Sequence, residues 1–569
     1  MHITYLGHAG FVAETDDVIV IMDPWLSPSG AFDASWFQLP CNHHLASLVY
    51  EKLRDPRRSI FLYVSHEHQD HLDVNFLNSL PVRRFSLLLP AFSRSALMSR
   101  FSNYECQELI FFHHRQQIQI SGGFLKLYVD DSQLNRDSAI LMKAGGTAFL
   151  NLNDCKLFDT LPEIVREEGP IKVFACQFSG ATWHPTCYDY PVERYETVSK
   201  KKYMAKFESV AKAIELIRPD VYIPSAGPVC FLDPMLFHLN LQRVNIFPRA
   251  AKIINYLNRR LWKTQTFAPE MMPGDVLDGT SGEIISLAER RFDEMTAQAY
   301  IAEYAASHSK YFEERHASHS RVNDEQTLEL LRVELESKLE RLSLAAWVSV
   351  PLYFRLSESA KLMLRVDFGR RAVEYVSRNN DTQYYEIVAP VWQVAKVLAR
   401  ELTWEEFSLT FRIRLKRDPD VYDPVLHAFL VMEAEDIGRY CDLLVQIEAQ
   451  EQRIVVEAGG REFSVRRYCP HQGGDLSCGW IDHGRFLTCP RHRWQFDLLR
   501  DGQCTTNATS IQAVCLEPGN LTAQDSAANE SLASCPSQAD AALRGNAHPN
   551  EIKPGAAGPR SAFVSRAND

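Results

Sequence analysis

The chain has 569 residues, of which 46% are hydrophobic and 23% charged, so it is too long for one hydrophobic core and several domains are expected. The formal net charge of −11 argues against nucleic acid or an anionic membrane as the main partner. No run of about 18 apolar residues occurs, and the strand-like segment 2–6 stands where an export signal would begin. These features predict a cytoplasmic protein. Its thirteen cysteines are too sparse and irregular for a disulfide framework.

Residues 1–245 are predicted to form an α/β domain. Short β-rich runs end in polar residues, and one later stretch has the apolar spacing of a helix. Polar loops at strand ends are where α/β folds hold their chemistry. The strand-like runs are 3–5, 11–13, 18–22 and 60–64, and the helical stretch is 207–217.

A cluster of possible metal ligands follows the run 60–64: His66, His68, Asp70 and His71. Histidines at positions i and i+2 share a face only in an extended chain, so the end of a strand is the expected host. The spacing His-x-His-x-Asp-His resembles the metallo-β-lactamase-fold signature and predicts an αββα domain. In that fold the first two histidines bind one metal, the Asp-His pair binds the other, and Asp154 stands where a bridging aspartate is expected.

Two histidines that usually complete such a site are missing. The stretch 128–133 contains none, and Ser225 stands where the late histidine is expected. Asp130 or Asp137 could replace the missing imidazole, which would give the His/carboxylate mixture that iron accepts. We therefore expect non-haem iron, as one or two ions, with zinc as the alternative. Two more residues at strand ends could be ligands, partners of ligands or structural hydrogen-bonding groups: His8 and Asp23.

The pattern changes over residues 246–440, where helical stretches precede strand-like segments that alternate with helices. One helix has a single apolar face, which we expect to pack against a core: Leu328, Leu331, Leu335, Leu339 and Leu342. The segment 340–435 looks like a sterol-carrier-type α+β fold. Residues 441–516 are predicted to form a small antiparallel β domain, and residues 517–569, nearly free of aromatic residues, a disordered tail.

The small β domain contains two Cys/His pairs, Cys469-x-His471 and Cys489-x-x-His492. A structural zinc ribbon normally uses Cys-x-x-Cys pairs, whereas two Cys and two His at this spacing suit the two irons of a Rieske [2Fe–2S] cluster. The glycines after the first pair and the aromatic residues after the second match the Rieske ferredoxin and oxygenase pattern. Gly474 and Arg491 stand where respiratory Rieske proteins form a disulfide, so the oxygenase type fits better.

The order of motifs in residues 1–435 resembles the cytidine monophosphate-N-acetylneuraminic acid hydroxylase family. That family joins a Rieske domain to a metallo-β-lactamase-like domain, and it has a histidine near the place of Gln133. Its Rieske domain comes first, whereas here it comes last, so this chain resembles a rearranged relative. The matching stretches are 3–9, 23–26, 65–72, 150–155, 218–222 with 226–227, and 415–422.

A basic run lies where the family has a similar one: Arg194, Lys200, Lys201, Lys202 and Lys206. A phosphate-bearing substrate could use it. We interpret the run as a solvated helix face, because charge runs usually are.

Together these features predict a Rieske-dependent non-haem iron monooxygenase, a hydroxylase or N-oxygenase of a small polar metabolite such as a sugar nucleotide or amino sugar. Its catalytic metal would be held by His66, His68, Asp70, His71 and Asp154. No flavin or nicotinamide motif is present, so an external ferredoxin or cytochrome-type reductase should supply electrons for the reaction with O₂. A hydrolase with a redox-regulatory Rieske domain and a non-catalytic electron-transfer protein remain alternatives.

Overall fold

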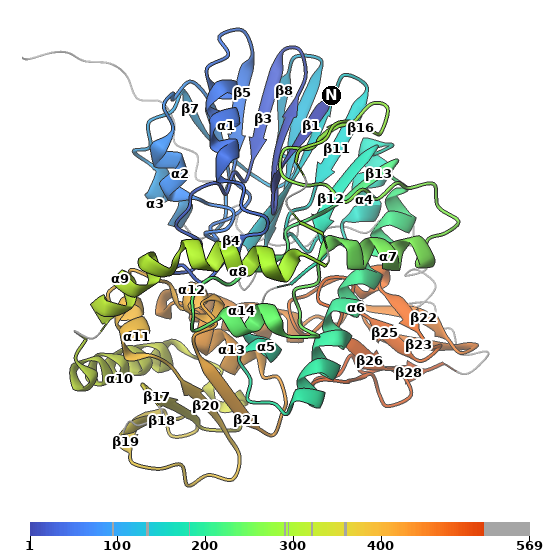
Figure 1. Ribbon diagram of the computed structural model, residues 1–569. Coiled ribbons are helices and arrows are strands. Elements are labelled where there is room, and N and C mark those ends of the chain that lie inside the picture. Colours follow the sequence, from blue (N-terminus) through green and yellow to red (C-terminus); the bar gives the residue numbers. More distant parts are fainter. Residues whose placement is uncertain are drawn as a thin grey trace, which may run out of the picture. The chain divides into compact units, whose positions relative to one another are not determined.

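The computed structural model describes residues 1–93, 96–132, 136–180, 182–289, 292–293, 295–319, 322–357 and 361–516. Its N-terminal part contains two large sheets (Figure 1). In spatial order, the first sheet consists of β16 (Glu283–Ser286), β15 (Val276–Asp278), β1 (His2–Gly7), β2 (Gly10–Glu14), β3 (Val18–Met22), β5 (Ser59–Tyr63), β6 (Ser86–Pro90) and β7 (Glu108–Phe112). The second consists of β13 (Val221–Ser225), β12 (Val173–Gln177), β11 (Thr147–Asn151), β10 (Arg136–Ala144), β9 (Gly123–Asp131) and β8 (Gln117–Ile120).

The two sheets pack face to face, since one apolar cluster contains Phe11 and Val20 from the first sheet and Ile140 and Phe149 from the second. Helices cover both outer faces. On the first sheet these are α1 (Ala46–Leu53), α2 (Val74–Ser79) and α3 (Ala96–Phe101). On the second they are α4 (Leu161–Glu168), α6 (Val192–Ile217) and α7 (Ala250–Arg260). The predicted αββα architecture is therefore confirmed.

The first domain does not end at residue 245, where the sequence pattern placed its boundary. Strands β15 and β16 extend the first sheet through β1, and α7 packs on the second sheet. The short pair β4 (Phe37–Gln38) and β14 (Val229–Cys230) lies near the helices α8 (Ala297–Ser307) and α9 (Ser309–His319).

The middle region is an α+β domain, as predicted. Its sheet has the order β19 (Ala372–Val376), β18 (Met363–Asp367), β17 (Leu352–Arg355), β20 (Tyr384–Val388) and β21 (Arg414–Asp418). Five helices pack with it: α10 (Asp324–Arg341), α11 (Val391–Leu398), α12 (Trp404–Leu409), α13 (Pro424–Val431) and α14 (Ala434–Glu448). The apolar face expected at Leu328 to Leu342 is buried in this core. Helix α14 runs past residue 440, so the C-terminal domain begins later than expected.

The C-terminal domain consists of two small antiparallel sheets around its own core, which confirms the predicted β domain. One contains β22 (Arg453–Ala458), β23 (Arg461–Arg466) and β28 (Val514–Cys515). The other contains β24 (Trp480–Asp482), β25 (Phe486–Thr488), β26 (Gln495–Asp497) and β27 (Gln503–Cys504). The tail expected to be disordered, 517–569, lies outside the described residues. Across the described ranges, no helix has both the length and the apolar character needed to cross a membrane.

Candidate functional site

The His-x-His-x-Asp-His segment lies in the loop that follows β5, at the C-terminal edge of the first sheet. Asp23, at the end of β3, holds this loop: it accepts hydrogen bonds from the Ser65 backbone N–H (2.7 Å) and from Ser65 Oγ (2.6 Å). Asp23 is buried and has a φ of 40°, a left-handed conformation that aspartate tolerates better than most residues. The ends of two neighbouring parallel strands thus fix the start of the motif.

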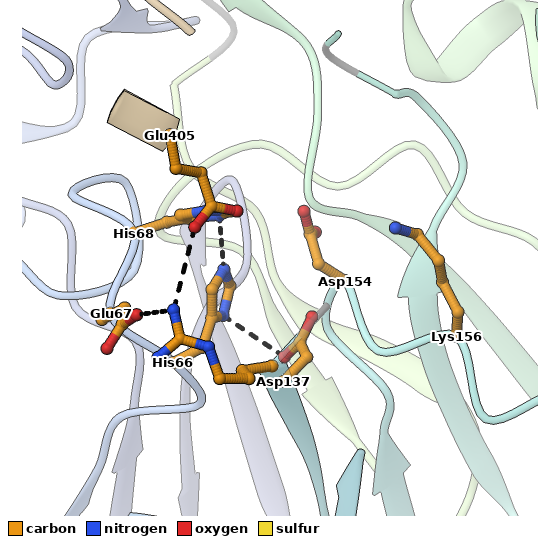
Figure 2. Close-up of a pocket in the computed structure, with 8 residues that line it drawn as sticks. His66, Glu67, His68, Asp137, Asp154, Lys156 and Glu405 are labelled. Atoms are coloured by element: carbon orange, nitrogen blue, oxygen red, sulfur yellow. Dashed lines mark hydrogen bonds and ion pairs between the residues drawn. The ribbon is translucent and has the colours of Figure 1, made fainter. Parts of the chain in front are cut away.

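The first two histidines of the motif face one another. His66 Nε2 lies 2.9 Å from His68 Nδ1, and both residues line a small pocket of about 50 Å³, as Figure 2 shows. Asp137 Oδ1 lies 3.2 Å from His66 Nδ1. His66, His71 and Asp154 place ligand atoms within 4.8 Å of one another, which suits a single metal ion held by nitrogen and oxygen.

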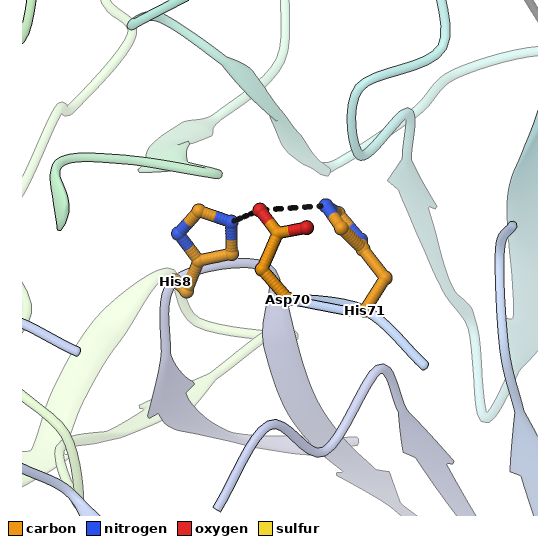
Figure 3. Close-up of side chains that lie close together, drawn as sticks. All are labelled: His8, Asp70 and His71. Atoms are coloured by element: carbon orange, nitrogen blue, oxygen red, sulfur yellow. Dashed lines mark hydrogen bonds and ion pairs between the residues drawn. The ribbon is translucent and has the colours of Figure 1, made fainter. Parts of the chain in front are cut away.

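A second group of ligand atoms adjoins the first. His8 Nε2 lies 3.0 Å from Asp70 Oδ2, and His71 Nε2 lies 3.9 Å from the same oxygen, as drawn in Figure 3. His71 Nε2 is also 3.7 Å from Asp154 Oδ1. His71 therefore belongs to both groups, and the bridging role expected for Asp154 stays a prediction.

The buried atoms of these groups that lack a hydrogen-bond partner include His71 Nε2, Asp70 Oδ1 and Asp154 Oδ1. Buried polar atoms without partners are rare, and each needs an explanation such as an ion. One imidazole nitrogen and two carboxylate oxygens are the donor types that iron and zinc accept. The residues present therefore fit a metal site.

Outer partners orient the imidazoles. Asp23 Oδ2 lies 2.8 Å from His71 Nδ1, and Glu405 Oε1, on α12, lies 3.1 Å from His68 Nε2. A carboxylate on one ring nitrogen fixes the tautomer and leaves the other nitrogen free to bind metal. Burial lowers the pKa of His71, but the charges of Asp70 and Asp23 outweigh it and raise this pKa to about 10. The negative charge of these carboxylates favours a bound cation in the site.

Two expected ligand candidates make contacts outside the two groups. Asp23 bonds Ser65 and the far side of the His71 ring, so its described contacts make it an outer partner. Asp130 lies against Arg491 of the C-terminal domain, with 3.3 Å between Asp130 Oδ1 and Arg491 Nη1. This cation engages one oxygen of Asp130, while Asp130 Oδ2 is buried without a hydrogen-bond partner, so a ligand role for Asp130 stays a prediction. Gln133 lies outside the described residues.

Sequence reasoning missed Glu405. It lies 337 residues from His68, in a helix whose local pattern, a Thr403 and Glu406 capping box, indicates only where the helix starts. Arg136 and Lys156, which line the same pocket, also had no local signal. Contacts between distant segments are not visible in a single sequence.

The two Cys/His pairs of the C-terminal domain converge as well. The rings of His471 and His492 have centroids 4.6 Å apart, and His471 stacks on Trp494 at 4.3 Å. His471 Nδ1 is buried without a hydrogen-bond partner, and Cys469 and Cys489 are buried and interact with each other. Two thiols and two imidazoles fit a Rieske cluster.

Gly474 and Arg491, which stand at the positions of the respiratory disulfide, lie side by side. A Cβ on Gly474 would lie 3.0 Å from Cys489 Sγ and 3.2 Å from the Arg491 side chain. The expectation that this chain lacks the disulfide clamp agrees with this packing. The glycine leaves room beside the ligand sulfur.

The cluster loops dock on the αββα domain through buried charges. Arg491 Nε donates to Asp159 Oδ2 (2.7 Å), and the Asp475 backbone N–H donates to the same oxygen (3.2 Å). Tyr422, between β21 and α13, lies 3.5 Å from His471 Nε2 through its hydroxyl. All three regions of the chain thus meet near the two sets of ligands.

Comparisons with known proteins bear on the C-terminal domain and on the family resemblance. Residues 427–516 match the Rieske [2Fe-2S] domain model, so the predicted Rieske domain is confirmed. A protein of Mycobacterium tuberculosis strain H37Rv, named as a Rieske 2Fe-2S iron-sulfur protein, is 29% identical over 531 residues, which are 89% of this chain and 98% of the relative. The cytidine monophosphate-N-acetylneuraminic acid hydroxylase of Mus musculus is 24% identical over 442 residues, 74% of this chain and 72% of the relative. The family resemblance is therefore confirmed.

Solved structures also resemble part of the chain. CmlA, a diiron beta-hydroxylase from Streptomyces venezuelae, is 14% identical and matches over 48% of this chain and 53% of its own, with a TM-score of 0.32. A metallo hydrolase from Ignicoccus hospitalis is 15% identical and matches over 48% of this chain and 97% of its own, with a TM-score of 0.31.

Proposed function

We propose that this protein is a Rieske-dependent non-haem iron oxygenase that acts on a small polar metabolite. The observation that supports this best is the docking of the cluster loops, through Arg491, on the domain that carries the metal pocket. A one-electron donor held against a metal site suits oxygen chemistry, whereas hydrolysis transfers no electrons. The similarity to hydroxylases also favours this proposal over the hydrolase alternative.

Two groups of residues would hold the metals. His66, His68 and Asp154 would serve one position, and Asp70 and His71 with His8 the other; Cys469, His471, Cys489 and His492 would hold the [2Fe–2S] cluster. When bound, iron supplies the activation of O₂, and the cluster supplies single electrons.

The remaining residues orient the ligands and shape the pocket. Asp23 and Glu405 each engage one ring nitrogen, so that the opposite nitrogens of His71 and His68 point into the site. Arg136, which pairs with Glu67, and Lys156 line the pocket together with Glu67, Asp137, Asp154 and Glu405, and both offer donors to the polar groups of a substrate. Because the pocket measures only about 50 Å³, only the reacting group of a substrate fits within it.

The substrate and electron donor are inferred from chemistry and from relatives. Resemblance to the hydroxylase relatives suggests a sugar nucleotide or an amino sugar, whose polar groups Arg136 and Lys156 would contact. An external ferredoxin or cytochrome-type reductase would deliver the electrons in a cytoplasmic setting. The twelve cysteines in the described part of the chain are free thiols, which agrees with a reducing compartment.

Metal analysis tests the proposal. Iron, zinc and acid-labile sulfide are measured per chain in anaerobically purified protein, in His66→Ala and in Cys489→Ala. We expect more than two irons per chain, with the excess lost in His66→Ala and the sulfide lost in Cys489→Ala. Zinc in the N-terminal site would favour a hydrolase, and two irons with no further metal would refute both catalytic functions.

A further inference from the structure

Three cationic side chains lie between helix α6 and the second cluster loop. Lys202 and Lys206 are four residues apart on α6, so they share one face of the helix. Arg493 follows the cluster ligand His492, with a φ of 61°. The proximity of these groups is evident in their electrostatic influence on one another: Arg493 acts on the pKa of both lysines. We expected the basic run to form a solvated helix face. This expectation is wrong for Lys206, which is only 7% exposed.

Lys206 lacks a partner for its charge. Within the described ranges its ammonium makes no hydrogen bond and no ion pair, and its Nζ would lie 3.4 Å from a Cβ placed on Gly180. Lys and Arg are almost never this buried unless they are paired. Burial and then the charge of Arg493 lower the pKa of Lys206 well below its ordinary value. The protein thus places a lysine where its charge is unfavourable without an anion.

The other two cations are also uncompensated. Lys202 Nζ donates to Thr182 Oγ1 (3.2 Å) and to the His184 carbonyl (2.6 Å), which are both neutral acceptors. Arg493 Nη1 is buried without a hydrogen-bond partner. Burial and the charge of Arg417 lower the pKa of Lys202 to about 7. Three hydrogen-bond donors whose positive charge is not neutralised by a described ion pair therefore lie near one another.

This cationic group adjoins the metal pocket. Asp154 and Lys156 line the pocket, and both act on the pKa of Lys206. Asp154 is the carboxylate with the largest effect on the pKa of Lys206, and a metal ion would compete for its charge. An anion from the solvent or from a substrate would neutralise the site.

We propose that Lys202, Lys206 and Arg493 bind a phosphate group, which belongs to the substrate and leaves the rest of that molecule directed at the metal pocket. Three cationic donors suit the several oxygens and the double negative charge of a phosphate monoester better than the single charge of a carboxylate. The assignment of the phosphate to a substrate rests on the proposed function, whereas the binding of phosphate does not.

The position of Arg493 beside His492 has a further consequence. A phosphate held there adds negative charge near the cluster, which disfavours its reduction. Reduction of the cluster and binding of phosphate are therefore linked. If phosphate shifts the reduction equilibrium by a given factor, reduction weakens the affinity for phosphate by the same factor. A tenfold weaker affinity in the reduced protein corresponds to a midpoint potential about 59 mV lower for a one-electron couple.

Calorimetric titration of the holoprotein tests the site with three probes: inorganic phosphate, methyl phosphate and acetate. We expect saturable binding of both phosphates and much weaker binding of acetate. Lys206→Met and Arg493→Gln should each weaken phosphate binding at least about tenfold, since each removes a charged donor. The matched control is Lys201→Gln, an exposed lysine on the same helix, which should bind as the parent does.

A potentiometric titration of the cluster, followed by its electron paramagnetic resonance signal, gives the second readout. Saturating phosphate should lower the midpoint potential of the parent and of Lys201→Gln, but not that of Lys206→Met. Acid-labile sulfide in each variant shows that the cluster is intact. No saturable phosphate binding, or unchanged affinity in Lys206→Met, would overturn the site, and binding of inorganic phosphate alone would overturn its assignment to a substrate ester. Neither readout needs iron at His66, so failure of the proposed oxygenase is detected separately by metal analysis.

Discussion

Replacement of Arg491 by methionine should release the cluster domain from the αββα domain. The Arg491 guanidinium lies 2.7 Å from Asp159 and 3.3 Å from Asp130, and all three side chains are at most 7% exposed. Removal of one partner from a buried ion pair costs about 3–5 kcal/mol, because the other charge stays buried. Here one cation serves two carboxylates, and Asp130 Oδ2 and Asp159 Oδ1 already lack hydrogen-bond partners. We therefore expect about 4 kcal/mol, or roughly a 10³-fold shift in the local opening equilibrium.

Hydrogen exchange followed by mass spectrometry measures this opening. Peptides that cover 152–160 and 469–476 should lose protection in Arg491→Met, while those from β1 and β2 should not. Arg485→Met is the matched control, because Arg485 pairs with Asp497 at the surface of the same domain, and it should leave exchange at 152–160 unchanged. Asp159→Asn combined with Arg491→Met should cost less than the sum of the single changes. Exchange within about threefold of the parent in Arg491→Met would correspond to less than about 1 kcal/mol and would refute the docking role of the pair.

Three further predictions concern the ligand shells and the contacts between regions. Gly474→Ala should lose most of its acid-labile sulfide, because the new Cβ would lie 3.0 Å from Cys489 Sγ. The control Gly438→Ala has open space around the new Cβ and should keep its sulfide. Equal sulfide content in the two variants would contradict the packing argument. Glu405→Gln should weaken metal binding at His68 by about 10–100-fold in a chelator competition. The control Glu401→Gln changes an exposed residue and should leave the metal affinity unchanged. Equal metal affinities in the two variants would exclude Glu405 as an orienting residue. Burial raises the pKa of Asp33, but the charges of Arg315 and Lys396 outweigh it and hold this pKa below its usual value. Its contribution to stability is therefore complete above the unfolded-state pKa of about 3.9 and is lost as pH falls through the folded-state value. Hydrogen exchange of α9 and α11 should accelerate in acid in the parent but show a smaller acid dependence in Asp33→Asn, and equal pH profiles would count against this role.

The sequence was informative where ligands are close together in the chain. His66 to His71 and the two Cys/His pairs could be predicted because the spacing of the residues itself defines the geometry of a metal site. The αββα layers could be predicted through the resemblance of the first segment to the metallo-β-lactamase-fold signature, and the small β domain because alternating apolar residues mark strands directly.

Contacts between distant segments could not be predicted in the same way. Asp130 and Asp137 are both carboxylates on neighbouring strands, and nothing local indicates that one meets Arg491 and the other His66. The basic run on α6 reads as a solvent-exposed face, but its register buries Lys206 while Lys201 stays exposed. Burial depends on which elements pack against a helix, and that information lies elsewhere in the chain.

The charges at the centre of the molecule account for how three regions form one site. The αββα domain supplies an excess of carboxylates around His66 and His71, the middle region adds Glu405, and the cluster domain contributes the cations Arg491 and Arg493. Apolar contacts alone would not fix the orientation of the cluster loops, whereas an arginine between two buried aspartates is satisfied in one orientation only. The position of the Rieske domain in the chain order therefore matters less than this interface. A domain joined at either end could dock in the same way, provided that the arginine and the two aspartates meet.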